Sequence, residues 1–320
     1  MKRSHLRQIA EQVLRQYPFS SKIRFYKEQD HVLFLVYAEH QGLRKRYVLK
    51  LRHRDSAPRH DDKLLFDWVR HLSVHAPVPV TIPPVSNLQG EDFTSVAEFA
   101  EYVGVVYPWI EGRLLSARLS LPNVRRWGRL LASIHRASKT FTQPAPVIRR
   151  WNTVYYWEPR VLYEDTFKSL FSKKGHSLFL RTEDRVQKCL DRLSAGSGTG
   201  SHLIHGDLHP GNVKVNKTLY ALDFDDFMRG YPIQDIAISL LYVRHRKNFS
   251  AIYQHFKAGY TSLQPWPEDD ALETLFMGRL LWMINARCSY EDLSDPDTLK
   301  DLKATVARYE QEFEAFHRSL

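Results

Sequence analysis

The sequence has few of the features that would place it outside the globular proteins. Its only two cysteines, Cys189 and Cys288, cannot form a disulfide framework and suit a reducing compartment. The 14 glycines and 16 prolines together make 30 of 320 residues, below typical combined usage, which excludes collagen and low-complexity disorder. The basic N-terminal residues have no apolar run behind them, and the apolar stretch 275–286 is interrupted by Arg279 and too short to cross a bilayer. We therefore expect a cytoplasmic protein without membrane association.

Length and charge narrow the class further. A chain of 320 residues with 43% hydrophobic residues predicts about two domains or one enzyme with two lobes. The net charge of +10 is concentrated in residues 1–70, which contain sixteen Lys and Arg against eight Asp and Glu. A basic lobe attracts polyanions, which include nucleic acid and equally nucleotide phosphates. No nucleic-acid recognition motif accompanies the charge, so nucleic acid is not the expected partner.

The first third of the chain predicts a small β-sheet with helices. Apolar spacing predicts helices over residues 4–17 and 60–75, the second ended by a proline cluster. Between them, runs rich in β-branched and aromatic residues predict an antiparallel meander over 23–26, 32–38 and 47–51. One or two more strands are expected in 93–107.

Helical patterns dominate after the strand that ends at Pro108 and Gly112. We place the lobe boundary here, with a nucleotide-binding lobe over residues 1–108 and a catalytic, acceptor-binding lobe over 109–320. The expected fold class is α+β, with a small antiparallel sheet lobe and a larger, mainly helical lobe.

The stretch 201–226, SHLIHGDLHPGNVKVNKTLYALDFDD, contains the predicted chemistry. Two short strands, 213–215 and 219–222, form a hairpin that returns the chain from Asn212 to Asp223. An amide oxygen and a carboxylate brought together suit Mg²⁺, which completes its shell with water and substrate phosphate. Asp207 then remains to orient an attacking hydroxyl and accept its proton. This arrangement indicates phosphoryl transfer.

Two other interpretations of this stretch remain open. Gly, Pro, Asn and Asp are also turn residues, although a turn-rich loop does not explain their order. His202, His205 and His209 could bind zinc, but no further Cys or His pair completes a tetrahedral site.

The motif HGDLHPGN followed by LDFDD resembles the aminoglycoside phosphotransferase and choline kinase family, which has a protein-kinase-like fold. The resemblance extends over nearly the whole chain in outline. YVLK at 47–50 resembles the strand with the phosphate-binding lysine, WIEGRLL at 109–115 the hinge, and RLLASIHRAS at 129–138 the helix after it. A bacterial stress-response kinase of protein serine and threonine and several small-molecule kinases are similar, and the motifs do not separate them.

The resemblance implies a role for each matching residue. Asp207 is the expected catalytic base, Asn212 and Asp223 the Mg²⁺ ligands, and Lys50 the ligand of the α and β phosphates of ATP. The carbonyl of Pro108 and the N–H of Ile110 are expected to bind adenine, while Trp109 packs.

Other residues near the motif have secondary expected roles. Asp225 assists at the metal, and His205 and His209 hydrogen-bond within the catalytic loop. Asp235 braces that loop, or caps the helix that begins after it. His135 is expected to pack on a helix face.

Two departures from the kinase pattern concern the phosphates. The turn over residues 27–31 contains no glycine, although a kinase phosphate loop is glycine-rich. The acidic partner of Lys50 is not evident among Asp61, Asp62 and Asp67, of which we favour Asp62. We expect Lys50 to face the surface and to be replaceable without loss of the fold.

The phosphate acceptor should lie between the catalytic loop and later polar and aromatic residues, namely Trp151, Tyr155, Tyr156, Trp157, Arg279, Trp282 and Asn285. The other interpretation of these aromatics is core. The acidic runs 268–270 and 291–292 could bind a polycationic acceptor, but the net positive charge argues against one.

The predicted function is ATP-dependent transfer of the γ-phosphate to a hydroxyl of a small molecule or of a protein serine or threonine. A catalytically silent, kinase-like protein that binds nucleotide or a partner is the alternative. Sequence does not separate ATP from GTP, and it does not identify the acceptor or the oligomeric state.

Overall fold

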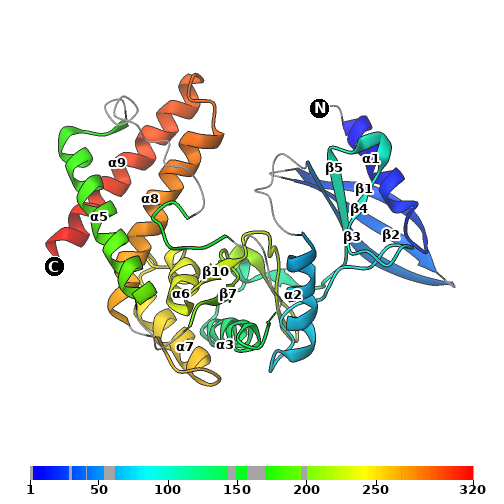
Figure 1. Ribbon diagram of the computed structural model, residues 1–320, viewed down its shortest axis with the longest axis horizontal. Coiled ribbons are helices and arrows are strands. Elements are labelled where there is room, and N and C mark those ends of the chain that lie inside the picture. The colour runs from blue at the N-terminus through cyan, green and yellow to red at the C-terminus, as the bar shows by residue number, and fades with distance from the viewer. Residues whose placement is uncertain are drawn as a thin grey trace.

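The computed structural model describes residues 3–28, 31–40, 42–53, 62–142, 149–156, 170–195, 200–267 and 269–319. Within these residues the chain forms a smaller lobe built on antiparallel strands and a larger lobe built mainly of helices (Figure 1). The predicted α+β class is confirmed.

A five-stranded antiparallel sheet in the order β1-β2-β3-β5-β4 forms the small lobe. Its first three strands are consecutive in the chain, as the predicted meander requires. The strands are β1 (Ser20–Glu28), β2 (Val32–His40), β3 (Leu43–His53), β4 (Thr94–Ser95) and β5 (Tyr102–Pro108).

Alternation along β3 gives the sheet its two faces. Leu49 and Leu51 are buried in the core that the sheet forms with helix α1 (Arg3–Leu14). Val48, Lys50 and Arg52 therefore lie on the opposite face, because successive side chains of a strand point to opposite sides. This second face is turned toward the large lobe, where Lys50 forms its ion pairs.

Helix α2 (Asp62–His75) belongs to the first part of the chain and lies between the sheet and α3 (Figure 1). Its Trp68 is fully buried, stacks on Phe227 with ring centroids 5.8 Å apart, and donates from Nε1 to Ser138 Oγ at 3.0 Å. The apolar face of α2 thus belongs to the core of the large lobe. The boundary between residues 108 and 109 stays a prediction.

The large lobe contains six described helices. They are α3 (Leu121–Ser138), α5 (Lys173–Ala195), α6 (Pro232–Leu241), α7 (Phe249–Thr261), α8 (Leu272–Tyr290) and α9 (Pro296–Arg318). Helices α3 and α7 approach so closely that a Cβ on Gly128 would lie 2.0 Å from the Phe256 carbonyl oxygen. Glycine at this contact allows the two backbones to touch.

Short strands frame the motif region. The sheet β6-β8-β9 and the pair β7-β10 are formed by β6 (Arg113–Leu114), β7 (His202–Ile204), β8 (Val213–Val215), β9 (Leu219–Ala221) and β10 (Met228–Gly230). Strands β8 and β9 pair antiparallel, which confirms the predicted hairpin. Four 3₁₀ turns complete the described elements: η2 (Ala97–Phe99), η3 (Leu115–Ala117), η4 (Pro210–Asn212) and η5 (Asp269–Ala271). No helix in the described part of the chain has the length and apolarity needed to span a membrane.

Candidate active site

The loop that follows β7 makes a sharp turn at Gly206. This residue has φ +80°, and a Cβ at this position would lie 2.1 Å from the Asp226 carbonyl oxygen. Both its conformation and the approach of Asp226 favour glycine here. The turn leads the chain from the buried strand directly to Asp207.

The Asp235 side chain holds this turn in place through hydrogen bonds. Its fully buried carboxylate accepts hydrogen bonds from the backbone N–H of His205 at 2.9 Å and of Gly206 at 3.0 Å, and from His135 Nε2 at 3.0 Å. The bracing role predicted for Asp235 is therefore seen. The helix-cap interpretation is wrong, because Asp235 lies inside α6, whose N-cap is Tyr231.

Asp207 is held by two side chains. Its Oδ1 accepts from Arg279 Nη2 at 2.9 Å, and its Oδ2 accepts from Asn212 Nδ2 at 3.0 Å. Burial raises the pKa of Asp207 well above its usual range, although the Arg279 guanidinium opposes the rise. A carboxylate has about four lone-pair sites, so each oxygen can accept a further hydrogen bond.

The histidines near Asp207 hydrogen-bond to the backbone. His205 donates from Nε2 to the Leu222 carbonyl at 3.0 Å and accepts on Nδ1 from the Asp207 N–H at 3.3 Å. His209 Nδ1 accepts from the Gly211 N–H at 2.9 Å, and burial lowers the pKa of His209 to about 4. The predicted bonds within the loop are thus present.

Zinc binding receives no support from these histidines. His202 Nδ1 lies 3.2 Å from the Gly200 carbonyl, so each of the three histidines has at least one ring nitrogen in a separate backbone contact. Within the described ranges no three His, Cys, Asp or Glu side chains converge on a metal position.

Asn212 and Asp223 are brought together by the hairpin between them. The Leu222 N–H donates to the Asn212 carbonyl at 2.8 Å, which joins the two ends of β8 and β9. The Asn212 amide nitrogen is bound to Asp207, so its amide oxygen is the atom suited to a cation. Asp223 has φ 59°, a left-handed conformation that is uncommon outside glycine and clusters at functional sites. The two residues therefore fit a Mg²⁺ site.

Lys50 reaches this segment from the small lobe. Its Nζ lies 2.7 Å from Asp223 Oδ1 and 2.7 Å from Asp225 Oδ2. Burial alone would lower the pKa of Lys50, but the two carboxylates outweigh it and raise that pKa. The expectation of a surface-facing lysine is wrong, because Lys50 is only 7% exposed.

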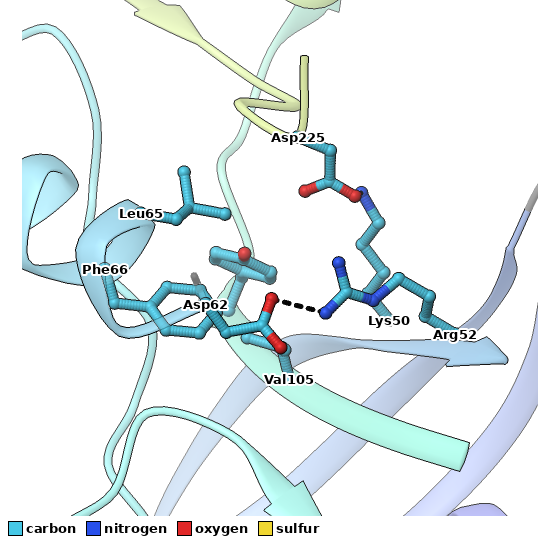
Figure 2. A pocket seen from close by; sticks show the side chains of 8 residues that line it. Lys50, Arg52, Asp62, Leu65, Phe66, Val105 and Asp225 are labelled. Carbon is cyan, nitrogen blue, oxygen red and sulfur yellow. Dashed lines mark hydrogen bonds and ion pairs between the residues drawn. The ribbon is translucent and has the colours of Figure 1, made fainter. Parts of the chain in front are cut away.

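Asp62 has a different partner from the one expected. Its carboxylate pairs with Arg52, two residues beyond Lys50 on the same face of β3, at 2.5 Å. Figure 2 shows Asp62 facing Arg52 across the small pocket, with Asp225 facing Lys50. Lys50 is thus paired with Asp223 and Asp225, while α2 is tied to the sheet through Arg52. Of the other candidates, Asp67 pairs with Lys63, and Asp61 lies outside the described residues.

The hinge follows β5. Pro108 is the last residue of that strand, opposite Tyr47, and the Trp109 N–H donates to the Arg46 carbonyl at 3.0 Å. The Ile110 carbonyl accepts from Lys214 Nζ, whose ammonium lies 4.4 Å from the Trp109 ring centroid. Trp109 packs between chain segments, as expected. The adenine contacts of Pro108 and Ile110 stay predictions, and residues 29 and 30 of the glycine-free turn lie outside the described residues.

Aromatic residues surround Arg279 beside Asp207. Tyr156 stacks on Trp282 with centroids 5.2 Å apart and meets Trp151 at 4.4 Å. The Arg279 guanidinium carbon lies 4.0 Å from the Trp282 ring centroid. The structure thus brings these predicted acceptor-side residues together, while Trp157 lies outside the described residues.

The sequence does not predict the pairing of Arg279 with Asp207, because nothing in the local pattern links residues 72 positions apart. The acidic runs have partners of their own: Asp270 pairs with Arg192 and Glu291 with Arg287.

Comparison with known proteins identifies the class. Residues 26–271 match the model of the phosphotransferase enzyme family. The match covers most of the chain, so the protein belongs to that family. The predicted family and enzyme class, a phosphotransferase of the kinase type, are confirmed.

Solved structures show the same fold at low sequence identity. A microcompartment-associated aminopropanol kinase is 20% identical over 98% of both chains, with a TM-score of 0.77. An amicoumacin kinase in complex with AMP-PNP, Ca²⁺ and Ami is 20% identical over 98% of this chain and 96% of that chain, with a TM-score of 0.79. Spectinomycin phosphotransferase in complex with ADP and spectinomycin is 16% identical over 97% of both chains, with a TM-score of 0.62. The protein-kinase-like fold is confirmed. No curated protein matches the sequence.

Proposed function

We propose that the protein transfers the γ-phosphate of ATP to a hydroxyl group of a small molecule, with Asp207 as the base. The observation that carries the proposal is that Lys50 of the small lobe converges on the segment of the large lobe that contains Asp207, Asn212 and Asp223. Asp207 lies in a braced loop, Asn212 hydrogen-bonds to it, and Lys50 pairs with Asp223.

Asp207 accepts the proton of the acceptor hydroxyl in this proposal. The hydroxyl oxygen forms a bond to the γ-phosphorus, the bond from that phosphorus to the β-phosphate oxygen breaks, and ADP leaves. Arg279 and Asn212 each occupy one direction on the carboxylate, which orients its remaining lone pairs. A high pKa of Asp207 makes it a stronger base.

Lys50, Asn212 and Asp223 bind the phosphates and their metal in this proposal. Mg²⁺ held by Asn212 and Asp223 would neutralise charge on the phosphate oxygens. In this proposal Lys50, which pairs with Asp223 and Asp225, binds the α and β phosphates when ATP is present. Pro108 and Ile110 bind the adenine edge.

The small-molecule acceptor is favoured by the surroundings of Asp207. They consist of buried aromatic side chains together with Arg279, an arrangement that suits a compact ligand. The structurally similar proteins named above include kinases of aminopropanol, amicoumacin and spectinomycin, which agrees with this choice.

A transfer screen tests the proposal. Purified protein is incubated with γ-labelled ATP and Mg²⁺ against amino alcohols, hydroxy acids, sugars, antibiotics with hydroxyl groups, and serine-containing proteins. We expect transfer to at least one small molecule and none to protein. ATP binding without transfer to any acceptor would support the catalytically silent alternative.

A further inference from the structure

Arg279 of α8 is a buried cation that the phosphate chemistry does not require. Its side chain is 5% exposed and contacts the catalytic base through Nη2, 2.9 Å from Asp207 Oδ1. Nη1 donates to the Tyr156 hydroxyl at 3.3 Å. Asp207 binds one of the five N–H groups of the guanidinium, and its other oxygen accepts from Asn212.

The guanidinium also fills a position that a cationic ligand would need. An ammonium group binds best over the face of a Trp or Tyr ring. Here the guanidinium carbon of Arg279 lies 4.0 Å from the Trp282 centroid and 5.8 Å from the Tyr156 centroid. The aromatic faces beside Asp207 thus already have a permanent positive charge.

The same cluster contains buried N–H groups that no hydrogen bond within the described part of the chain satisfies. Arg279 Nε, Trp151 Nε1 and Trp282 Nε1 are buried and have no hydrogen-bond partner among the described residues. A buried donor without an acceptor is costly, so such groups call for a partner. Oxygen atoms of a ligand would supply one, whereas an ammonium group has no lone pair to offer.

On the basis of the proposed function, we propose that Arg279 determines acceptor specificity and that the acceptor bears a carboxylate near its hydroxyl. Arg presents its N–H groups in a planar fork that matches a carboxylate, and charge-assisted hydrogen bonds of this kind are the strongest available to it. The hydroxyl of such an acceptor faces Asp207 while its carboxylate takes the unused donors of Arg279. An amino alcohol would bring a second cation to the same place.

Wild-type protein tests this directly through matched ligands. Glycolate is compared with ethanolamine, and 3-hydroxypropanoate with 3-amino-1-propanol. Binding is followed by isothermal titration calorimetry without ATP, so the result does not depend on phosphate transfer. We expect at least one acid to bind 10-fold or more tighter than its matched amine. Equal or tighter binding of the amines, or no binding of either acid, would overturn the proposal.

Variants show whether Arg279 is responsible. Arg279→Met should weaken binding of the acid at least 10-fold, and Arg279→Lys should weaken it less, because the charge is kept and the fork is lost. Arg287→Met, on the same helix and paired with Glu291 and Asp301, is the control and should bind the acid as the wild type does. Melting temperature and ATP affinity confirm folding, and Arg279→Lys serves if the Met variant does not fold. Unchanged acid binding in a folded Arg279 variant contradicts the assignment.

The two proposals fail differently. Wild-type protein that binds an acid but transfers phosphate to nothing contradicts the proposed function alone. Transfer to amino alcohols in preference to their matched acids contradicts the specificity assigned to Arg279 and leaves the phosphotransferase function intact.

Discussion

At the scale of single residues, Lys50 shows how pairing and burial act together. Its ammonium lies between Asp223 and Asp225, whose side chains are 37% and 27% exposed. A buried lysine usually has a depressed pKa, but two carboxylates at 2.7 Å reverse the direction. The same pair of carboxylates loses its nearest counter-charge when the lysine is removed.

Lys50→Met should therefore destabilise the protein as well as weaken ATP binding. We expect a loss of about 1–3 kcal/mol in the free energy of unfolding, because an unpaired, partly buried carboxylate is costly. Urea unfolding of the variant, and of Lys50→Met with Asp225→Asn, measures it. Less destabilisation in the double variant would identify the unpaired carboxylate as the cause, whereas wild-type stability in Lys50→Met would show that the ion pairs contribute nothing.

Asp235 is a second residue whose charge affects stability, through the loop that contains His205 and Gly206. Burial alone would raise the pKa of Asp235, but hydrogen bonds from His135 and the His205 N–H lower it below its ordinary value. A group with a depressed folded-state pKa stabilises the fold above its unfolded pKa, about 3.9 for Asp. That contribution is lost as the pH falls through the folded-state value.

Asp235→Asn should accordingly be less stable than the wild type at pH 7, and the difference should narrow below about pH 4. Urea unfolding at pH 7, 4 and 3 provides the comparison. A difference that stays constant over this range would mean that the carboxylate charge of Asp235 does not stabilise the loop.

At the scale of elements, the contact between α3 and α7 positions the residues that hold Asp235 in place. Helix α3 presents His135 to Asp235, and His135 Nδ1 also lies 2.8 Å from the Tyr260 hydroxyl of α7. This geometry requires the close approach of the two helices at Gly128 and Gly259.

Gly128→Ala should destabilise the protein by about 1–3 kcal/mol, since the added methyl group meets backbone atoms that cannot move aside. Gly200→Ala is the matched control, because a Cβ there has nothing within 4 Å. Thermal unfolding of both variants compares them. Equal melting temperatures would show that the helices can separate at no cost.

The elements near the motif could be predicted from the sequence, since their signals are local. The hairpin after Asn212 and the strand that carries Lys50 follow from residue type and spacing over a few positions. The partners of Lys50 and Asp207 could not, because Asp223 and Arg279 are 173 and 72 residues away from them in the chain. Local pattern therefore favours a nearby acidic residue such as Asp62 as the partner of Lys50, although tertiary packing pairs Asp62 with Arg52.

At the scale of the whole molecule, the candidate site requires both lobes. Lys50 comes from the sheet, whereas Asp207, Asn212 and Asp223 come from the helical lobe. Arg46 of the sheet also pairs with Glu111 in the hinge segment. A ligand that contacts both lobes should stabilise their arrangement, because binding to the folded state alone shifts the unfolding equilibrium.

ATP with Mg²⁺ should raise the melting temperature by several degrees more than ATP with EDTA, since the phosphates then gain the metal as a bridge to Asn212 and Asp223. Asp223→Ala should remove the Mg²⁺-dependent part of the increase. Differential scanning fluorimetry of both proteins measures this. An increase that depends equally on Mg²⁺ in the variant would exclude Asp223 as a metal ligand.

Asp207→Asn tests the central claim most directly, because it keeps the size of the side chain and removes the base. We predict that phosphate transfer by this variant falls by about 10²–10⁴-fold, the usual contribution of a positioned general base. ATP affinity, assigned to Lys50 and the hinge, should change by no more than a few-fold. Both quantities are measured on the same protein preparation, with the acceptor found by the transfer screen. Equal turnover in the wild type and in Asp207→Asn would contradict the account.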